Sequence, residues 1–260
     1  MLNFFRKFPL TSYQTDVKDP NAQQVVVDLF RGIKVDIDRI DNANAYHLYE
    51  IQDGMRPDQI SFELYETPEY FWTFFLINEH LRNGLHNWPK SYSQLTEYAN
   101  NKYQRKVITP VIIGNTPGEA HLVGLSGLQV GETLTNISIT ASAKVEKIDV
   151  LLNQIHITMI NGTFAASDQL LSSASNTVIL NNSQYTYTIV DEINAPHHYI
   201  DTSGNVIARI PFATTDTNTY IPVTNLQYEE DENDKYTSIR VLTPSMVDTF
   251  AETYKTVINA

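Results

Sequence analysis

The sequence predicts an α+β protein with a small module of one strand and two helices, an inserted antiparallel β domain and a C-terminal helix. A strand-like stretch precedes two short helices that begin at Pro57 and Pro68, where proline suits the first helical turn. Between residues 107 and 190 charges become sparse, and short alternating runs of Ser, Thr, Asn, Val and Ile dominate. After Pro244 apolar residues recur at helical spacing.

These patterns divide the chain into consecutive segments. The expected segments are an N-terminal arm and helix (1–43), a βαα module (44–104), an inserted β-rich domain (105–193) and a C-terminal segment that ends in a helix (194–260).

Composition favours a soluble, acidic protein with protein partners. The chain has 260 residues, 42% of them hydrophobic, and a formal net charge of −12. Nucleic-acid binding requires a basic surface, so we expect no nucleic-acid partner. The absence of cysteine excludes disulfides and thiolate sites. The N-terminus lacks a signal-peptide pattern, and the apolar stretch Tyr70–Ile77 is too short to cross a bilayer, so we expect no membrane contact.

Two elements are expected before the module. Asn21 and Gln24 have the spacing of a capping box, which predicts a short helix that ends at Gly32. Residues 33–38 alternate strictly between apolar and charged side chains, which is typical of a strand. Residues 45–51 are expected to form a second strand, the first element of the module.

The module itself is predicted from capping residues and apolar spacing. In the first helix Ile60 and Leu64 mark the buried side. Thr67 and Pro68 then restart the pattern as N-cap and first helical residue. Because both helices are too short to be stable alone, they are expected to pack on each other. Ser91 is expected to cap a third helix.

The inserted domain is predicted to be a small antiparallel sandwich or barrel. The Asn161–Gly162 pair is expected to form a hairpin turn. The alternating runs that predict strands are 137–140, 145–150, 155–159, 177–180 and 185–189. After the insert, Tyr228–Asp234 is expected to be a solvated acidic run, 236–242 a strand, and Thr243–Pro244 the start of the last helix.

Several of these segments together resemble the LysM-like baseplate wedge subunits of contractile-tailed bacteriophages. The most specific stretches join Arg56-Pro57-Asp58 to Tyr65-Glu66-Thr67-Pro68-Glu69-Tyr70-Phe71-Trp72. The supporting segments, in order, are Asp28–Arg31, Tyr49–Ile51, Trp88–Pro89, Asn101–Tyr103, His197–Tyr199, Tyr228–Ile239, Pro244 and Phe250.

The resemblance implies a non-enzymatic structural subunit of the virion that joins neighbouring wedges of a six-fold baseplate. Its expected partners are other wedge subunits, with six or more copies per baseplate, and its expected location is the tail baseplate after assembly in the host cytoplasm. Residues 103 and 197 lie close together in many relatives, which supports an insertion between them. Many relatives have Gly where Glu66 stands and Asp where Asn87 stands, and a left-handed Glu66 is expected to cost about 1 kcal/mol.

The alternative function is a LysM-type module that binds peptidoglycan or chitin. The sequence pairs it with no catalytic domain, and the aromatic second helix suits burial better than an exposed sugar platform. We expect no cofactor, small-molecule substrate or catalytic site, because Ser126 does not fit a nucleophile elbow and Gly114–Gly118 lacks the ending of a phosphate loop. His197 and His198 are adjacent in an expected strand and should point in different directions, so no metal site is expected.

The main assembly contacts are expected on the module helices and the C-terminal helix. The second helix carries more aromatic surface than so small a module readily encloses, and the C-terminal stripe has the spacing of a helix laid in a groove. Substitution of Phe250 or Tyr254 by Asp is therefore expected to leave the monomer folded. Trp72 is expected mainly in the core, and Trp88 as a plug under the helices or, as the alternative, an interface anchor. The candidate interface residues are Arg56, Tyr65, Tyr70, Trp72, Trp88, Phe250 and Tyr254.

Overall fold

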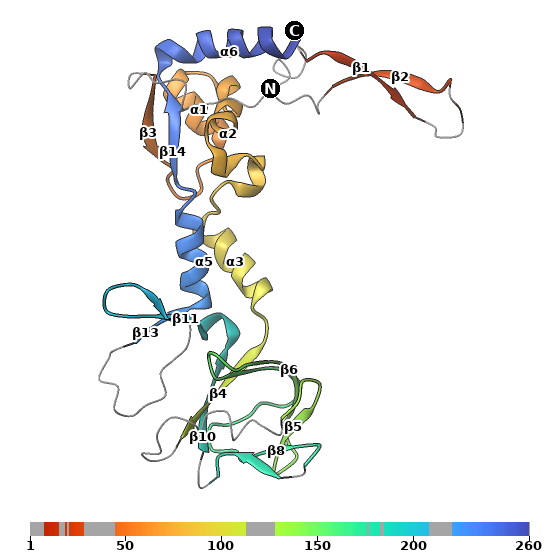
Figure 1. The fold of residues 1–260 in the computed structure, drawn as a ribbon, viewed down its shortest axis with the longest axis vertical. Coiled ribbons are helices and arrows are strands. Elements are labelled where there is room, and N and C mark those ends of the chain that lie inside the picture. The colour runs from red at the N-terminus through yellow and green to blue at the C-terminus, as the bar shows by residue number, and fades with distance from the viewer. Residues whose placement is uncertain are drawn as a thin grey trace. The chain divides into compact units, whose positions relative to one another are not determined.

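The chain folds as an α+β protein that divides into two compact units (Figure 1). The computed structural model describes residues 8–15, 19, 21–28, 45–112, 128–175, 177–182, 185–207 and 220–259. The first unit comprises Met1–Ser93 and Glu232–Ala260, and the second comprises Gln94–Asp231. The first unit is therefore built from both ends of the sequence.

The first unit combines two small antiparallel sheets with short helices. Strands β1 and β2 pair as a hairpin, and β3 pairs with β14 from the far end of the chain. Ile60, Phe74 and Leu81 pack against Ile239 and Val241 of β14 to form its main core. The bounds are Leu10–Gln14 for β1, Gln23–Val27 for β2, Tyr46–Glu50 for β3, Pro57–Tyr65 for α1, Trp72–Ile77 for α2, Ser238–Leu242 for β14 and Pro244–Asn259 for α6.

Strand β14 is fixed on its side away from β3 by a buried amide. The Asn78 side chain accepts a hydrogen bond from the backbone N–H of Arg240 at 2.8 Å and donates to its carbonyl at 2.9 Å. The same amide donates to the Phe74 carbonyl at 2.9 Å. Asn78 thus connects the end of α2 to β14 and occupies groups that another strand would otherwise bond.

Helix α1 begins and ends as the sequence predicts. Pro57 is its first residue, and the Gln59 side chain accepts the backbone N–H of Arg56 at 3.0 Å. Glu66 closes the helix in the left-handed conformation, with φ of +58°, and donates its N–H to the Phe62 carbonyl at 2.9 Å. The expected strain at Glu66 is therefore present.

Replacing Glu66 with Gly is expected to raise the free energy of unfolding by about 1 kcal/mol, because glycine adopts this conformation without a Cβ clash. Glu66 is exposed, so little packing is lost. Urea unfolding of Glu66→Gly measures the change, with Glu66→Ala as the control that keeps the Cβ. Equal stability of the two variants would contradict this explanation.

The helix predicted to start at Asn21 is wrong. Gln23–Val27 form strand β2, paired residue by residue with β1. Three consecutive valines favour an extended backbone, because their branched side chains are restricted in a helix. The remainder of that predicted helix and the strand expected at 33–38 lie outside the described residues.

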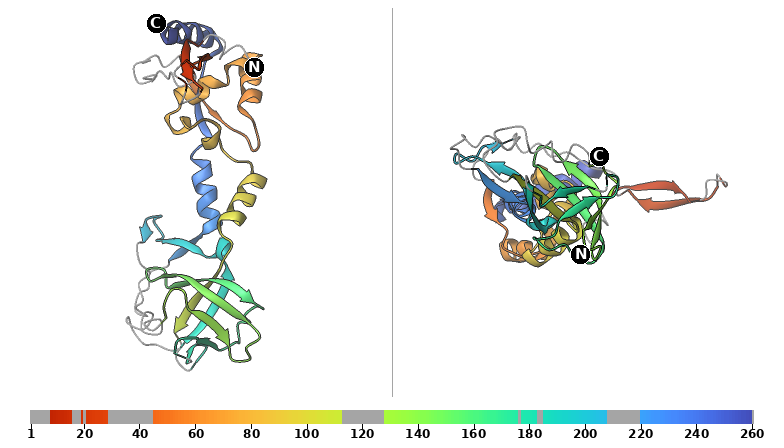
Figure 2. Two further views of the ribbon diagram at one scale, coloured as in Figure 1. Left: turned by 90° about the vertical axis from the view of Figure 1, so that its right-hand side faces the viewer. Right: turned by 90° about the horizontal axis from the view of Figure 1, so that it is seen from below.

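The second unit contains a seven-stranded antiparallel sheet in the order β10-β4-β7-β6-β5-β8-β9. The sheet curls until its two edge strands, β9 and β10, come into contact (Figure 2). Its core includes Ile108, Leu134, Ile155, Ile157 and Leu170. The bounds are Lys106–Ile112 for β4, Thr133–Asn136 for β5, Ser142–Asp149 for β6, Gln154–Asn161 for β7, Leu170–Ser172 for β8, Val178–Leu180 for β9 and Tyr185–Asp191 for β10.

Two details of this domain differ from the sequence prediction. Residues 137–140 form the turn between β5 and β6 and not a strand. Asn161–Gly162 does not close a hairpin, because β7 pairs with β4 and β6, whereas the next strand, β8, pairs with β5. Gly162 has φ of +58°, and a Cβ there would lie 2.4 Å from the Thr140 carbonyl oxygen. The glycine therefore allows a close approach of two backbone segments.

The rest of the second unit contains two longer helices and a small sheet. Helix α3 spans Tyr92–Lys102 and helix α5 spans Asn225–Asp234, and both cross the boundary between the units. A three-stranded sheet follows the order β12-β11-β13, with bounds Val206–Ile207, Pro196–Ile200 and Ile221–Thr224. The acidic run expected to be a solvated surface is helical, and its Glu229 is buried.

Candidate assembly surfaces

Helix α6 packs on α2 through an aromatic cluster. The ring of Trp72 stacks on Phe250 at a centroid distance of 6.2 Å and lies 5.2 Å from Tyr254. Trp72 and Tyr254 are each only 7% exposed. The stripe expected on the C-terminal helix therefore exists, but it is buried within the chain itself.

Two tyrosine hydroxyls reinforce this packing. Tyr65 donates a hydrogen bond to the Leu242 carbonyl at 2.9 Å, and its burial raises its pKa. Tyr70 donates to the carboxylate of Asp248 on α6, and this hydrogen bond, with burial, raises the pKa of Tyr70 to about 12. Both hydroxyls therefore connect the module helices to the C-terminal segment as hydrogen-bond donors.

The expectation that the module leaves excess aromatic surface for a neighbour is wrong for these residues. Tyr65, Tyr70, Trp72, Phe250 and Tyr254 lie among one another or against Leu242 and Val247. The C-terminal strand and helix return to the module and cover side chains that the two short helices cannot enclose alone. Substitution of Tyr254 by Asp is accordingly not expected to leave the monomer intact.

Trp88 lies as a plug beneath the module. Its indole Nε1–H donates to the Met55 carbonyl at 2.8 Å, and its ring packs against Phe74 and Phe75. A tryptophan with its N–H satisfied inside the fold contributes to the core.

Arg56 remains at the surface, at the start of α1. Its side chain is 68% exposed, and its Nε and Nη2 each lie 3.1 Å from a carboxylate oxygen of Asp58. A contact of Arg56 with a carboxylate of a neighbouring subunit would thus compete with this bidentate pair inside the chain.

The large apolar side chains that the first unit leaves exposed lie outside the aromatic cluster of α2 and α6. Phe62, on the outer side of α1, is 61% exposed, and sequence reasoning did not single it out. The exposure of Phe62 can be predicted from helical spacing. Phe62 is two residues from both Ile60 and Leu64, so it faces away from these buried-side residues. The other large exposed side chains of this unit include Leu10, Tyr13, Val25, Leu48 and Leu85.

In the second unit a buried carboxylate connects α3 to α5. One Glu229 oxygen accepts hydrogen bonds from the Lys102 ammonium at 2.6 Å and the Tyr103 hydroxyl at 2.7 Å. Burial and the hydrogen bond to Glu229 raise the pKa of Tyr103 to about 12. Breaking this contact would leave Glu229 buried without its cation, which is strongly unfavourable.

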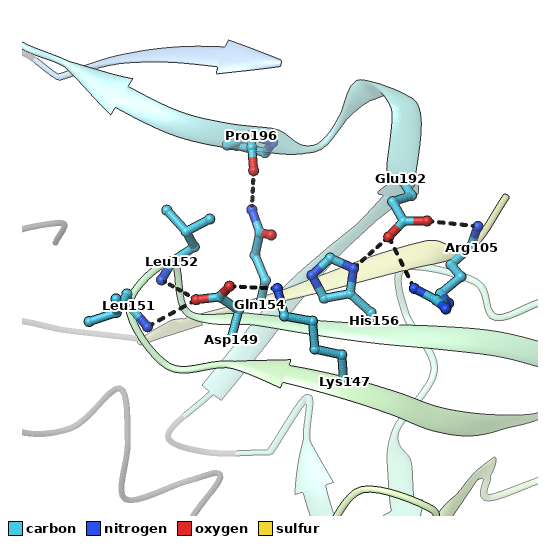
Figure 3. A network of polar contacts seen from close by, with 9 residues as sticks. All are labelled: Arg105, Lys147, Asp149, Leu151, Leu152, Gln154, His156, Glu192 and Pro196. Atoms are coloured by element: carbon cyan, nitrogen blue, oxygen red, sulfur yellow. Dashed lines mark hydrogen bonds and ion pairs between the residues drawn. The ribbon is translucent and has the colours of Figure 1, made fainter. Parts of the chain in front are cut away.

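A second polar network lies where the β domain joins the small sheet (Figure 3). Glu192 accepts the Arg105 backbone N–H at 3.1 Å, and its other oxygen lies 2.8 Å from Nδ1 of the buried His156. Gln154 donates to the Pro196 carbonyl at 2.8 Å. These contacts fix the segment that follows β10, which is a structural function for Glu192, His156 and Gln154.

His197 and His198 do not point in different directions as expected. Their Nδ1 atoms lie 3.0 Å apart, and the His197 ring stacks on Tyr228 at 3.8 Å. Pairing of β11 with β13 shifts register between Pro196 and His198, and this bulge changes the alternation of side chains. Within the described ranges no group of three or more His, Cys, Asp or Glu residues could hold a metal ion. Ser126 and Gly114–Gly118 lie outside the described residues.

The end of the β domain near the β5–β6 turn carries exposed isoleucines. Ile139 is 79% exposed and has φ of +53°, a strained conformation for a β-branched residue. The Asn136 side chain holds this turn, because its Oδ1 accepts the N–H groups of Thr140 and Ala141. Ile137 and Ile160 are also exposed.

No helix in the described part of the chain is both long and apolar enough to cross a membrane.

The chain was compared with known proteins and with models of protein families. A search among curated proteins finds no match to the chain. Residues 2–112 match the family model described as Base plate wedge protein 53, and the matched segment includes β1, β2, β3, α1, α2 and α3. This match supports a structural protein of a phage tail baseplate that interacts with other baseplate proteins.

Proposed function

We propose that the chain is a subunit of a phage tail baseplate wedge that joins neighbouring wedge proteins during assembly, and that it catalyses no reaction. The observation that carries the proposal is the family match over residues 2–112. Exposed apolar side chains on the described part of that segment, among them Tyr13 and Phe62, support it because such residues anchor protein interfaces.

The proposal includes a LysM-like module assembled from distant parts of the sequence. In this arrangement β3, α1, α2 and β14 form a βααβ unit, with β3 and β14 paired antiparallel. The closing strand comes near the C-terminus, so a large insertion separates α2 from β14. An inserted domain at 105–193 is supported by the pairing of its two end strands, in which Val107 lies opposite Val190.

We further propose that the subunit acts in the virion after assembly in the host cytoplasm, in six or more copies, and without nucleic acid or membrane partners. Interface residues are then those that stay exposed in the monomer. Arg56 remains a candidate, and Phe62 is added. The other six candidates are assigned to stabilising the module: Tyr65, Tyr70, Trp72, Trp88, Phe250 and Tyr254.

Phe62→Asp is expected to reduce incorporation into baseplates while leaving the melting temperature within about 2 °C of the wild type, because the side chain is exposed. Incorporation is measured by co-sedimentation with wedges assembled from purified subunits. Phe62→Leu, which keeps an apolar side chain, is the matched control. It is expected to be incorporated into wedges nearly as well as the wild type.

A cell-wall pull-down separates this function from the alternative, a LysM-type peptidoglycan- or chitin-binding module. The wild-type chain is expected not to sediment with purified peptidoglycan at physiological salt. Saturable sedimentation, together with no incorporation into wedges, would favour the sugar-binding module.

A further inference from the structure

The hairpin of β1 and β2 contacts the rest of the first unit at its base, whereas most residues of the two strands are exposed. Phe8 packs against the cluster of Trp72, Ala251 and Tyr254, and the backbone N–H of Asp28 donates to the Pro9 carbonyl at 2.8 Å. All residues of β1 are exposed, as are the first residues of β2. Two-stranded hairpins are marginally stable alone, so this one requires further contacts to be rigid.

The strands of the hairpin lack the features that protect sheet edges. Among the residues of β1 (LTSYQ) and β2 (QQVVV) there is no charge and no proline. Natural proteins usually protect an edge with lysine, proline or a bulge, because unpaired N–H and C=O groups accept another strand. Within the described residues, β1 and β2 form a two-stranded sheet with no further strand paired to either.

The hydrogen-bond register shows which backbone groups are available. The bonds from Asp28 to Pro9 and from Thr15 to Ala22 define the pairs that bond each other across the hairpin. In an antiparallel pair every second residue directs its backbone N–H and C=O groups away from the partner strand. Here these residues include Leu10 and Ser12 on β1 and Val25 on β2. Val26 and Val27 of β2 are partly covered, whereas β1 is exposed throughout, so β1 is the more accessible edge.

We propose that β1 adds as a strand to the exposed sheet edge of another baseplate protein, an inference that rests on the proposed function. The hairpin lies within the segment that matches the baseplate wedge family. Main-chain hydrogen bonds along β1 supply the contact, and Leu10 and Tyr13, on opposite faces of the strand, occupy pockets of the partner. A different protein is favoured over a second copy, because copies that each carry a net charge of −12 repel one another.

The test removes a single outward N–H group. Ser12→Pro takes it from β1 without removing a backbone hydrogen bond within the hairpin, and proline is tolerated in edge strands. The Ser12 Oγ hydrogen bond to Gln23 Oε1, at 3.1 Å, is lost in Ser12→Pro and in Ser12→Ala alike, so the comparison of these two variants isolates the backbone N–H. Incorporation into wedges assembled from purified subunits is expected to fall by about tenfold or more, since the ring also blocks the approaching strand. Ser12→Ala keeps the N–H and Val25→Pro alters only the β2 edge, so both are expected to incorporate like the wild type.

Any of the following results would contradict the proposal that β1 adds to the sheet of another baseplate protein. If Ser12→Pro incorporates as well as Ser12→Ala, or if Val25→Pro is equally defective, β1 is not the docking edge. If light scattering shows that the wild type dimerises and Ser12→Pro does not, the partner is a second copy. If the wild type itself is not incorporated, the proposed function fails, and not the assignment of the edge alone.

Discussion

Tyr254→Asp is expected to destabilise the first unit by about 3–5 kcal/mol. The substitution removes a buried aromatic ring from the Trp72 cluster and places a carboxylate where the native side chain is 93% covered. Since α6 is held by this cluster, the helix is expected to detach and expose Trp72. Circular dichroism in urea and the wavelength of tryptophan emission measure the two effects.

Val257→Asp is the matched control on the same helix. Val257 is 50% exposed, so the new carboxylate remains solvated. Its free energy of unfolding is expected to stay within about 0.5 kcal/mol of the wild type. If Tyr254→Asp melted like Val257→Asp, α6 would not be packed on α2 in solution, and its stripe would again be available to a neighbour.

Deletion of residues 107–190 is expected to leave the first unit folded, with its melting transition preserved. Lys106 pairs with Asp191 across β4 and β10, so the ends to be joined are cross-strand neighbours about 5 Å apart. A short Gly/Ser linker can span this distance without strain. The core of Ile60, Phe74 and Ile239 lies wholly outside the deletion.

The same deletion is expected to loosen the segment after β10. It removes His156 and Gln154, which bond Glu192 and Pro196. Hydrogen exchange should therefore increase around residues 192–200 and remain unchanged in β3 and β14. Aggregation of the shortened chain, together with an unfolded isolated insert, would show that the domain is not an independent insertion.

Local elements were predictable where a few neighbouring residues determine them. Pro57 and Pro244 begin helices as predicted, and the alternating runs of β6, β7, β9 and β10 predict strands. Pro68 was expected to begin the second helix, but it begins only the 3₁₀ turn Pro68–Tyr70, and α2 starts at Trp72. The left-handed conformation of Glu66 was expected only from the resemblance, because many relatives have Gly at this position. By contrast, Asn21 and Gln24 fit a capping box, but the valines that follow pair with β1, and this pairing determines the conformation.

Features that depend on distant contacts were not predictable. The sequence indicates that Trp72 lies on the apolar side of one helix and Tyr254 on the apolar side of another. It does not indicate that these two side chains pack against each other. Apart from Arg56, the interface candidates are therefore residues that the chain itself covers wholly or in part. The bulge that brings His197 beside His198 depends on pairing with β13, which lies beyond a long connection.

A cryo-EM reconstruction of the intact tail would place this chain among its neighbours. We expect density for the chain in the baseplate, with α6 packed on α2 and exposed residues such as Tyr13 and Phe62 covered by neighbouring subunits. A baseplate in which this chain is absent, or in which these surfaces contact only solvent, would contradict the proposed function.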